Sequence, residues 1–395
     1  MSLHTPFPLA SEIALAHSQS VLTLIKEQIL ASDGWISFEQ FMNLALYAPG
    51  MGYYSSGATK LGRAGDFVTA PEISSLFGRT LAQQLSQISQ CLQHPYILEF
   101  GAGSGRLALD ILIELEKTAE LPEKYFIMEV SAELRQRQLT LLASKAPHLI
   151  HRVEWLERLP DQFNGIILAN EVLDAMPVHL IAWHDNAIFE RGVSWHNDQL
   201  TWQDQPLQDI DLHSIASQIT SQINPNSDSH FEYVSEFNLT AIGFMRSLAK
   251  LLRQGVILLI DYGFGRDEYY HPQRNQGTLM CHYRHYAHDN PFYLPGLQDI
   301  TSHVDFSAVT HAAVDSNLTL LGYTTQAFFL INSGITKILA QIPVEDTARY
   351  LPQSNQLQKL INPAEMGELF KVIAFGKEFT EPLIGFSAGD MSRLL

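Results

Sequence analysis

The stretch Tyr96-Ile-Leu-Glu-Phe-Gly-Ala-Gly-Ser-Gly-Arg106 decides the fold. Its apolar start is typical of a buried β-strand, and glycines follow at positions 101, 103 and 105. Behind the glycines, apolar residues recur at helical spacing: Leu107, Ala108, Ile111, Leu112 and Leu115. A strand, a glycine turn and a helix in this order predict the first unit of a doubly wound α/β sheet, where a nucleotide-like ligand lies beyond the strand's carboxyl end.

The spacing of the glycines separates the candidate ligands. A dinucleotide-binding turn has the pattern G-x-G-x-x-G, and its third glycine would fall on Arg106. Gly101, Gly103 and Gly105 form G-x-G-x-G instead, with Glu99 just before them. This arrangement resembles motif I of the S-adenosylmethionine (SAM) methyltransferases. A glycine turn that binds nothing is the alternative.

The second predicted strand, residues 124–130, supports a ligand-binding fold because it ends in Glu129. In this fold an acid at that place accepts hydrogen bonds from both ribose hydroxyls. The structural alternative is an acid beside a helix N-terminus, since Ser131 could cap a helix over 132–143.

Composition narrows the class of protein. The 395 residues carry a net charge of −17 with no basic run, which argues against nucleic acid and anionic membrane surfaces as partners. Cys91 and Cys281 form no spaced pair, so we expect two free thiols. The first 19 residues resemble neither a signal nor a transit peptide, and no apolar run is long enough to span a membrane. We therefore expect a soluble, cytoplasmic protein without membrane insertion.

The remaining periodicity predicts further elements on both sides of the glycine turn. We expect helices over 9–31 and 37–47 and a third that follows Gly78 and runs to about residue 91, with a glycine-rich loop before it. The other strands are expected near 151–155, 163–169, 255–262, 325–331 and 370–375, and a helical segment near 336–361. Residues 180–235 read as an antiparallel insertion, and the irregular segment 263–316 reads as a mobile cap.

Several stretches together resemble one family, the MidA-like methyltransferases, to which the mitochondrial complex I assembly methyltransferase belongs. The matches are Gly65–Gly78, Ala169–Val178, Asp261-Tyr-Gly263, Gly277-Thr-Leu279, Pro295-Gly296, Asp299–Ser307 and Met366–Val372. The resemblance covers roughly residues 10–386, although Leu173 and Met176 stand where the family often has Phe and Leu. It implies a class I SAM-methyltransferase fold, SAM as cofactor, and methylation of a protein arginine, such as one in a respiratory-complex subunit.

The resemblance also divides the chain. We expect an N-terminal helical segment and cofactor-covering loop, a Rossmann-like domain in two parts, an antiparallel insertion, a cap or substrate insertion, and C-terminal strands that complete the sheet. The N-terminal segment and loop cover 1–93, and the two parts of the Rossmann-like domain cover 94–183 and 236–262. The antiparallel insertion covers 184–235, the cap or substrate insertion 263–322, and the C-terminal strands 323–395.

An arginine acceptor needs carboxylates, because the guanidinium stays protonated and must be oriented toward the methyl group. Glu171 and Asp174 are the first candidates, since they follow the strand that ends near Ala169, and Asn170 beside them could contact the cofactor's methionine end. The alternative reading of both acids is as caps of a helix that begins there.

Asp66 and Glu72 are the second pair of candidate acids. Thr69 and Pro71 lie between them, in a segment that in this fold commonly closes over SAM. The competing interpretation is a Thr-x-x-Glu capping box, with Thr69 as N-cap and Glu72 three residues on.

Trp155, at the end of the third strand, could stack on the adenine or simply lie in the core. The spacing of His282, His285, His288 and His303 matches no known zinc site, so we expect no metal.

The leading hypothesis is a SAM-dependent protein arginine methyltransferase. A SAM-binding assembly factor without essential catalysis and a small-molecule methyltransferase are the alternatives, and a homodimer is a further expected partner arrangement.

Overall fold

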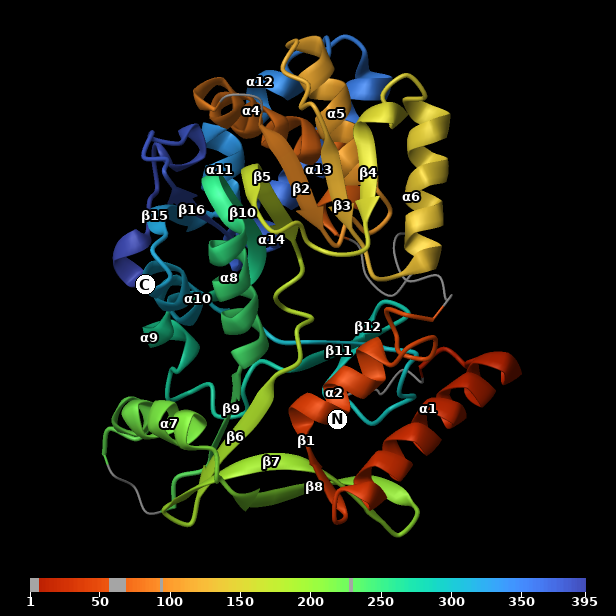
Figure 1. Ribbon diagram of the computed structural model, residues 1–395, viewed down its shortest axis with the longest axis vertical. Helices are drawn as coiled ribbons and strands as arrows, with labels where there is room; N and C mark the ends of the chain where they lie inside the picture. The colour runs from red at the N-terminus through yellow and green to blue at the C-terminus, as the bar shows by residue number, and fades with distance from the viewer. Residues whose placement is uncertain (1–6, 57–68, 93–94, 227–229) are drawn as a thin grey trace. The chain divides into compact units, whose positions relative to one another are not determined.

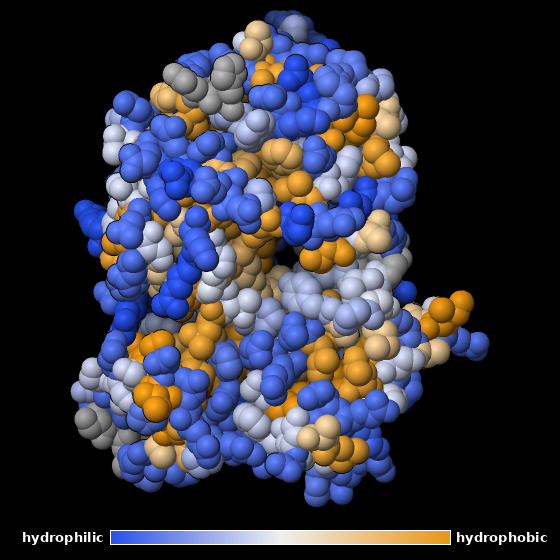
Figure 2. Space-filling view, viewed as in Figure 1, coloured by the Kyte–Doolittle hydropathy of each residue, from blue (hydrophilic) through white to orange (hydrophobic). Residues whose placement is uncertain are grey.

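The computed structural model describes residues 7–56, 69–92, 95–226 and 230–395. The chain divides into two compact units, each assembled from three separate segments (Figure 1). Unit 1 comprises residues 1–67, 175–240 and 267–303, and unit 2 comprises residues 68–174, 241–266 and 304–395. Hydrophilic residues cover most of the face drawn in Figure 2, in keeping with the excess of acidic side chains.

Unit 2 contains a central sheet of eight strands. Its strands are β2 (Tyr96–Phe100), β3 (Tyr125–Met128), β4 (Val153–Leu156), β5 (Phe163–Asn170), β10 (Leu252–Phe264), β14 (Val304–Asp305), β15 (Thr319–Thr325) and β16 (Phe370–Lys377). The order is β15-β16-β10-β5-β2-β3-β4, with β14 on the end of β10. Strands β4, β3, β2, β5 and β10 are parallel, and β16 is antiparallel to its neighbours. This is the doubly wound α/β sheet that the glycine turn predicted.

The central strands are buried on both faces, as parallel strands between helix layers must be. In β5, Ile166 and Leu168 join one large core with helices α4 (Ser75–Cys91) and α5 (Arg106–Lys117), while Ile167 and Ala169 face the other side. On that other side the ring of Phe100 meets Phe244 edge-on, with 5.0 Å between centroids.

The helices of unit 2 account for most of the remaining chain. They are α3 (Ala70–Ile73), α6 (Ala132–Lys145), α8 (Leu239–Leu251, which begins in unit 1), α10 (Phe306–Asp315), α11 (Gln326–Asn332), α12 (Ile335–Leu339), α13 (Thr347–Ile361) and α14 (Met366–Leu369). The predicted strand over 325–331 is wrong. Thr325 ends β15 and caps α11, because its side chain accepts a hydrogen bond from the Phe328 amide.

Unit 1 has its own core and two antiparallel sheets. Its elements are α1 (Glu12–Ala31), β1 (Trp35–Ser37), α2 (Phe38–Tyr47), β6 (His179–His184), β7 (Ala187–His196), β8 (Gln199–Pro206), α7 (Ile210–Ile223), β9 (Tyr233–Phe237), β11 (Met280–Tyr283), β12 (Tyr286–His288) and β13 (Asp299–Thr301). The short helix α9 (Arg266–Tyr269) links the units. The antiparallel insertion is present, but it includes the unpredicted helix α7, and 263–316 contains a three-stranded sheet rather than only loop.

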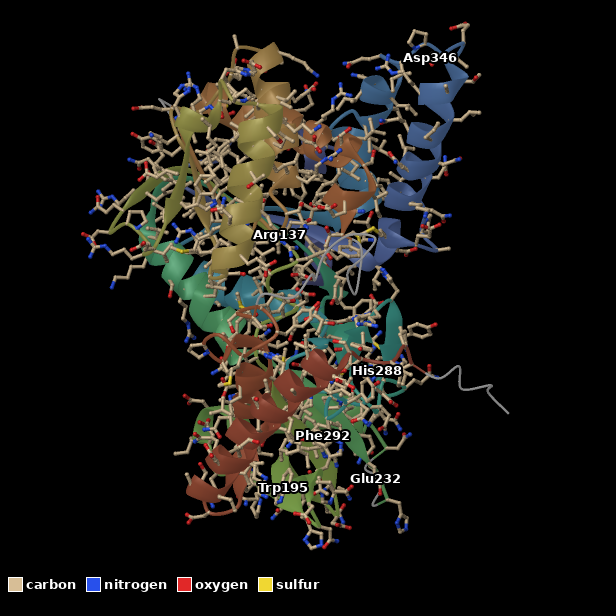
Figure 3. All side chains as sticks on the ribbon, turned by 90° about the vertical axis from the view of Figure 1, so that its right-hand side faces the viewer. Arg137, Trp195, Glu232, His288, Phe292 and Asp346 are labelled. Carbon is tan, nitrogen blue, oxygen red and sulfur yellow. The ribbon has the colours of Figure 1, made fainter. Side chains whose placement is uncertain are left out.

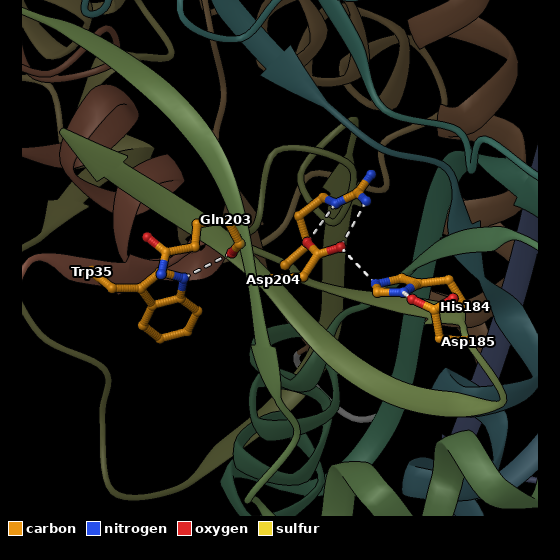
Figure 4. Close-up of polar contacts among 6 residues, drawn as sticks. Trp35, His184, Asp185, Gln203 and Asp204 are labelled. Carbon is orange, nitrogen blue, oxygen red and sulfur yellow. Dashed lines mark hydrogen bonds and ion pairs between the residues drawn. The ribbon is translucent and has the colours of Figure 1, made fainter. Parts of the chain in front are cut away.

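Side-chain contacts fix the register of the larger sheet in unit 1. Arg191 forms a bidentate ion pair with Asp204 across β7 and β8, and His184 bonds the same carboxylate from β6 (Figure 4). The Trp35 indole donates to the Gln203 carbonyl, so β1 is tied to β8 (Figure 4). As predicted, Ser37 caps α2, and it does so in a complete capping box with Gln40.

Candidate functional site

The sheet of unit 2 reverses its strand order between β2 and β5, which is where ligands bind in open α/β sheets. The glycine turn follows β2, and Asn170 ends β5, so both lie at the same edge of adjacent strands. A Cβ on Gly101 would come within 3.0 Å of the Val172 side chain, which places the two turns in contact. The predicted cofactor turn and the predicted acids are therefore neighbours.

The glycine turn has the backbone that its sequence requires. Gly101, Gly103 and Gly105 have φ values of +63°, +53° and +83°, in the left-handed region that favours glycine. Gly105 caps the N-terminus of α5. The turn thus exposes backbone to a ligand at the start of a helix, where N–H groups and the helix dipole attract polar ligand groups.

Glu129 follows β3 and is almost fully buried. Its carboxylate accepts a 2.9 Å hydrogen bond from the Ser131 amide and a 3.1 Å bond from Gln138. Ser131 caps α6, so the expected capping is confirmed, yet it is the Ser131 side chain that caps and not Glu129. These bonds hold the carboxylate in one orientation beside the glycine turn.

Glu171 and Asp174 do not cap a helix, because residues 171–176 form turns. Glu171 has a φ of +54°, a strained value for a glutamate that functional sites often contain. Its amide donates to the Ile260 carbonyl, and its carboxylate accepts from Asn170. Asp174 is buried and accepts a 2.6 Å hydrogen bond from the Tyr262 hydroxyl.

Asp261, at the end of the buried part of β10, holds this turn in place. One of its oxygens accepts hydrogen bonds from three successive amides, those of Val172, Leu173 and Asp174, at 3.2, 2.9 and 3.2 Å. Burial, and then the negative charges of Asp174 and Glu171, raise the pKa of Asp261 well above its ordinary value. The site therefore brings the two carboxyl groups of the turn close to a third carboxyl group on β10.

The other predicted residues occupy different places. Glu99 lies under the turn and accepts a 2.7 Å hydrogen bond from the Tyr125 hydroxyl on β3. Glu72 accepts a bond from Ser104 of the glycine turn, and the Thr69 side chain makes no capping bond, so the capping-box interpretation is wrong. Pro71 is buried in the first turn of α3. Asp66 lies outside the described residues.

Trp155 is half-buried on β4, and its indole donates a 2.7 Å hydrogen bond to Gln138. Sequence reasoning missed Gln138, Asp261 and Tyr262. Asp261 was recoverable, because it follows a buried strand just as Glu129 does. Gln138 was recoverable too, because it stands between Leu134 and Leu142 on the buried face of α6.

Residues 76–324 match the sequence profile of a family of S-adenosyl-L-methionine-dependent methyltransferases. The chain belongs to this family. Its cofactor is SAM, as the glycine spacing indicated. Over 99% of its length it is 45% identical to a COG1565 superfamily member from Burkholderia thailandensis bound to S-adenosyl-homocysteine, with a TM-score of 0.94 and coverage of 100% of that chain. The predicted fold class is thereby confirmed.

Curated relatives of this methyltransferase are protein arginine methyltransferases named NDUFAF7. The Danio rerio protein is 29% identical, with 90% of this chain and 86% of the relative covered. The Homo sapiens protein is 28% identical, with 87% and 81% covered. Both are named as mitochondrial, so the expected cytoplasmic location is wrong by this comparison.

The residues at the sheet edge fit SAM. The left-handed glycines leave room at the turn, Glu129 is a buried acceptor suited to ribose hydroxyls, and Asn170 contributes an unsatisfied acceptor. The Asn170 side-chain oxygen is buried and has no hydrogen-bond partner among the described residues, as expected for an acceptor that binds a donor group of a ligand.

In the same described part of the chain, no group of three His, Cys, Asp or Glu side chains could hold a metal ion. None of the described helices has the length and apolar character needed to span a membrane.

Proposed function

We propose that this methyltransferase transfers the methyl group of SAM to an arginine side chain of a partner protein. The observation that carries the proposal is the acidic turn after β5, where Glu171 and Asp174 lie beside the glycine turn and Asp261 fixes their backbone. Support also comes from the curated relatives, which are named protein arginine methyltransferases. The partner suggested by the family resemblance, a respiratory-complex subunit, belongs to this proposal, as does the expected homodimer.

The chemistry of arginine explains why acids are needed. The guanidinium of arginine has a pKa of about 12 or more, so it stays protonated at neutral pH, and its nitrogen lone pairs are delocalised. Paired carboxylates bind the guanidinium, direct one nitrogen at the methyl donor, and stabilise positive charge while the proton leaves. Methyl transfer is a direct displacement whose rate depends on the alignment of the acceptor nitrogen with the methyl group. No side chain of the protein therefore has to form a covalent bond with the substrate. In this proposal Glu171 and Asp174 bind the acceptor, and Tyr262 orients Asp174 through its hydroxyl.

The proposal places SAM at the glycine turn, with its ribose on Glu129. We expect Gly103→Val to abolish SAM binding, since a β-branched residue is unfavourable at a φ of +53° and fills the space of the ligand. Glu129→Ala should weaken binding because it removes the ribose acceptor. Calorimetric titration with SAM measures both effects. An unchanged affinity in folded Gly103→Val protein would place SAM elsewhere.

The acids are tested separately from SAM binding. Glu171→Gln and Asp174→Asn keep side-chain shape but remove the charge that pairs with guanidinium. Loss of one such contact costs about 1.5–3 kcal/mol, so we expect methyl transfer to slow roughly 10- to 100-fold. The SAM dissociation constant should change little. Single-turnover methylation is compared with SAM titration, and wild-type rates in both variants would contradict the proposed role.

Two other functions remain distinguishable from this one. A small-molecule methyltransferase would transfer label from methyl-tritiated SAM to a soluble metabolite fraction, and an assembly factor without essential catalysis would transfer none. For a protein arginine methyltransferase, we expect label in one protein band of a native lysate. Mass spectrometry of that band then identifies the methylated residue.

A further inference from the structure

One buried side chain connects three parts of the proposed SAM site. Gln138 of α6 is fully buried, although it carries an amide. Its NH₂ group donates to the Gly103 carbonyl at 2.9 Å and to the Glu129 carboxylate at 3.1 Å. Its oxygen accepts from the Trp155 indole at 2.7 Å. Both donors and the acceptor of the amide are therefore used.

The contacts leave only one orientation for the amide. If oxygen and nitrogen were exchanged, the oxygen would face a carbonyl and a carboxylate, and the NH₂ group would face the indole N–H. Each of these contacts would be repulsive, because an acceptor would face an acceptor or a donor would face a donor. A leucine at this position would match the apolar spacing of Leu134 and Leu142, so the amide occupies a position where packing alone favours a hydrocarbon.

The backbone around Gln138 is equally close to the turn. A Cβ on Gly105 would lie 3.1 Å from the Cα and Cγ of Gln138, well inside normal contact. The neighbouring residues of the helix make other contacts: Arg137, labelled in Figure 3, pairs with Glu133, and Gln136 is exposed. Helix α6 thus contacts the glycine turn through Gln138.

We infer that Gln138 is a positioning residue for SAM, which fixes the glycine turn and the ribose-binding carboxylate of Glu129 relative to each other. This inference rests on the proposed placement of SAM. By bonding Gly103 and Glu129 at once, Gln138 sets the separation of the two groups that would bind the cofactor. By accepting from Trp155, it also fixes the side chain that flanks them.

The test uses two replacements of Gln138 and one matched control. Gln138→Met keeps the length of the side chain but has no NH₂ donor, and we expect its SAM dissociation constant to rise about tenfold or more. In Gln138→Glu the new carboxyl group can donate one hydrogen bond when protonated, but when ionised it repels Glu129. Burial and the Glu129 charge should hold its pKa above the ordinary value of about 4.3. The control, Gln136→Glu, makes the same chemical change on the exposed face of the same helix.

Calorimetric titration with SAM is performed from pH 5.5 to pH 8 for all four proteins, with thermal unfolding recorded for each. For Gln138→Glu, the dissociation constant divided by that of the wild type should rise about tenfold across this range. For Gln136→Glu the ratio should stay flat. A purely structural role would lower the melting temperature without this pH-dependent ratio.

The outcomes separate this inference from the placement of SAM. If Gly103→Val binds SAM normally, the placement itself fails. If Gly103→Val loses binding while the Gln138→Glu ratio stays flat, the role of Gln138 is overturned. Should Gln138→Met not fold, the pH dependence of Gln138→Glu decides alone.

Discussion

Glu99 is a buried carboxyl group whose pKa depends on its surroundings. Burial raises the pKa of Glu99 to about 7, while the hydrogen bond from Tyr125 acts in the opposite direction and the charge of Glu129 raises it further. Burial, and then the charge of Glu99 and the hydrogen bond to it, raise the pKa of Tyr125 well above its ordinary value. A group buried this way is neutral in the folded protein at pH values where it is ionised in the unfolded chain.

This difference predicts a pH-dependent stability. Below pH 4.5 Glu99 is protonated in both states; between pH 4.5 and about 7 only the folded state keeps the proton, so its contribution to stability falls as pH rises. The total loss is on the order of 3 kcal/mol. Glu99→Gln cannot titrate, so its free energy of unfolding minus that of the wild type should grow by about this amount from pH 4.5 to pH 7.5. Denaturant unfolding at several pH values measures it, and a constant difference would contradict the buried acid.

Among single residues, the sequence predicted those that stand at the ends of strands better than those that hold these residues in position. The positions of Glu129 and Asn170 at the ends of β3 and β5 were predicted because parallel strands end at one edge of the sheet. The position of Gln138 on the buried face of α6 is visible in the sequence, but its hydrogen-bond partners come from three different segments and leave no local pattern.

Among the elements, the turn over residues 171–174 depends on the strand beside it. The four hydrogen bonds that Asp261 accepts, three from this turn and one from the Tyr262 amide, all require an acceptor atom. Asp261→Asn puts an NH₂ group against at least one of these donors. We expect a loss of about 1–3 kcal/mol in unfolding free energy and slower methyl transfer, because Glu171 and Asp174 lose their positions.

Tyr262→Phe is the matched variant for this prediction. It removes the hydroxyl that contacts Asp174 and leaves the backbone bonds to Asp261 intact. Methyl transfer should therefore slow with little change in the denaturation midpoint. Equal loss of stability in both variants would show that the carboxylate of Asp261 does not hold the turn.

Other elements show why local patterns succeed or fail. The capped helix over 37–47 was predicted closely, because Ser37 and Gln40 form a signal within one turn. The segment 325–331 was assigned to a strand because a short apolar run cannot be told from a buried helix by periodicity. Thr325 is the N-cap residue of the helix there, and its side chain accepts a hydrogen bond from the Phe328 amide.

In the molecule as a whole, distant segments are joined into each unit. Ile36 of β1 pairs with Val193 of β7, so the N-terminal segment and the insertion share one sheet. The sequence analysis kept the N-terminal segment apart from the insertion, because pairing across more than a hundred residues is not visible in local periodicity. The parallel strands of unit 2, in contrast, form the doubly wound sheet that the glycine turn predicted.

All the residues proposed to contact SAM belong to unit 2, so SAM should stabilise that unit. A ligand at 100 times its dissociation constant adds about 2.7 kcal/mol. For a unit of this size that corresponds to a rise of roughly 5–10 °C in melting temperature. Differential scanning calorimetry with and without SAM measures the shift, with Gly103→Val as the unresponsive control. No shift in the wild type would contradict SAM binding by unit 2.

The position of β16 has a consequence for synthesis of the chain. This strand follows every other strand of its sheet in the sequence, yet it lies between β10 and β15. Until it leaves the ribosome, one edge of β10, with its apolar run from Val256 to Ile260, has no strand to pair with in that sheet. Such an unpaired apolar edge is a template for aggregation. In a nascent chain of this protein, this edge of β10 therefore stays unpaired in the sheet while the residues from β10 to β16 are translated.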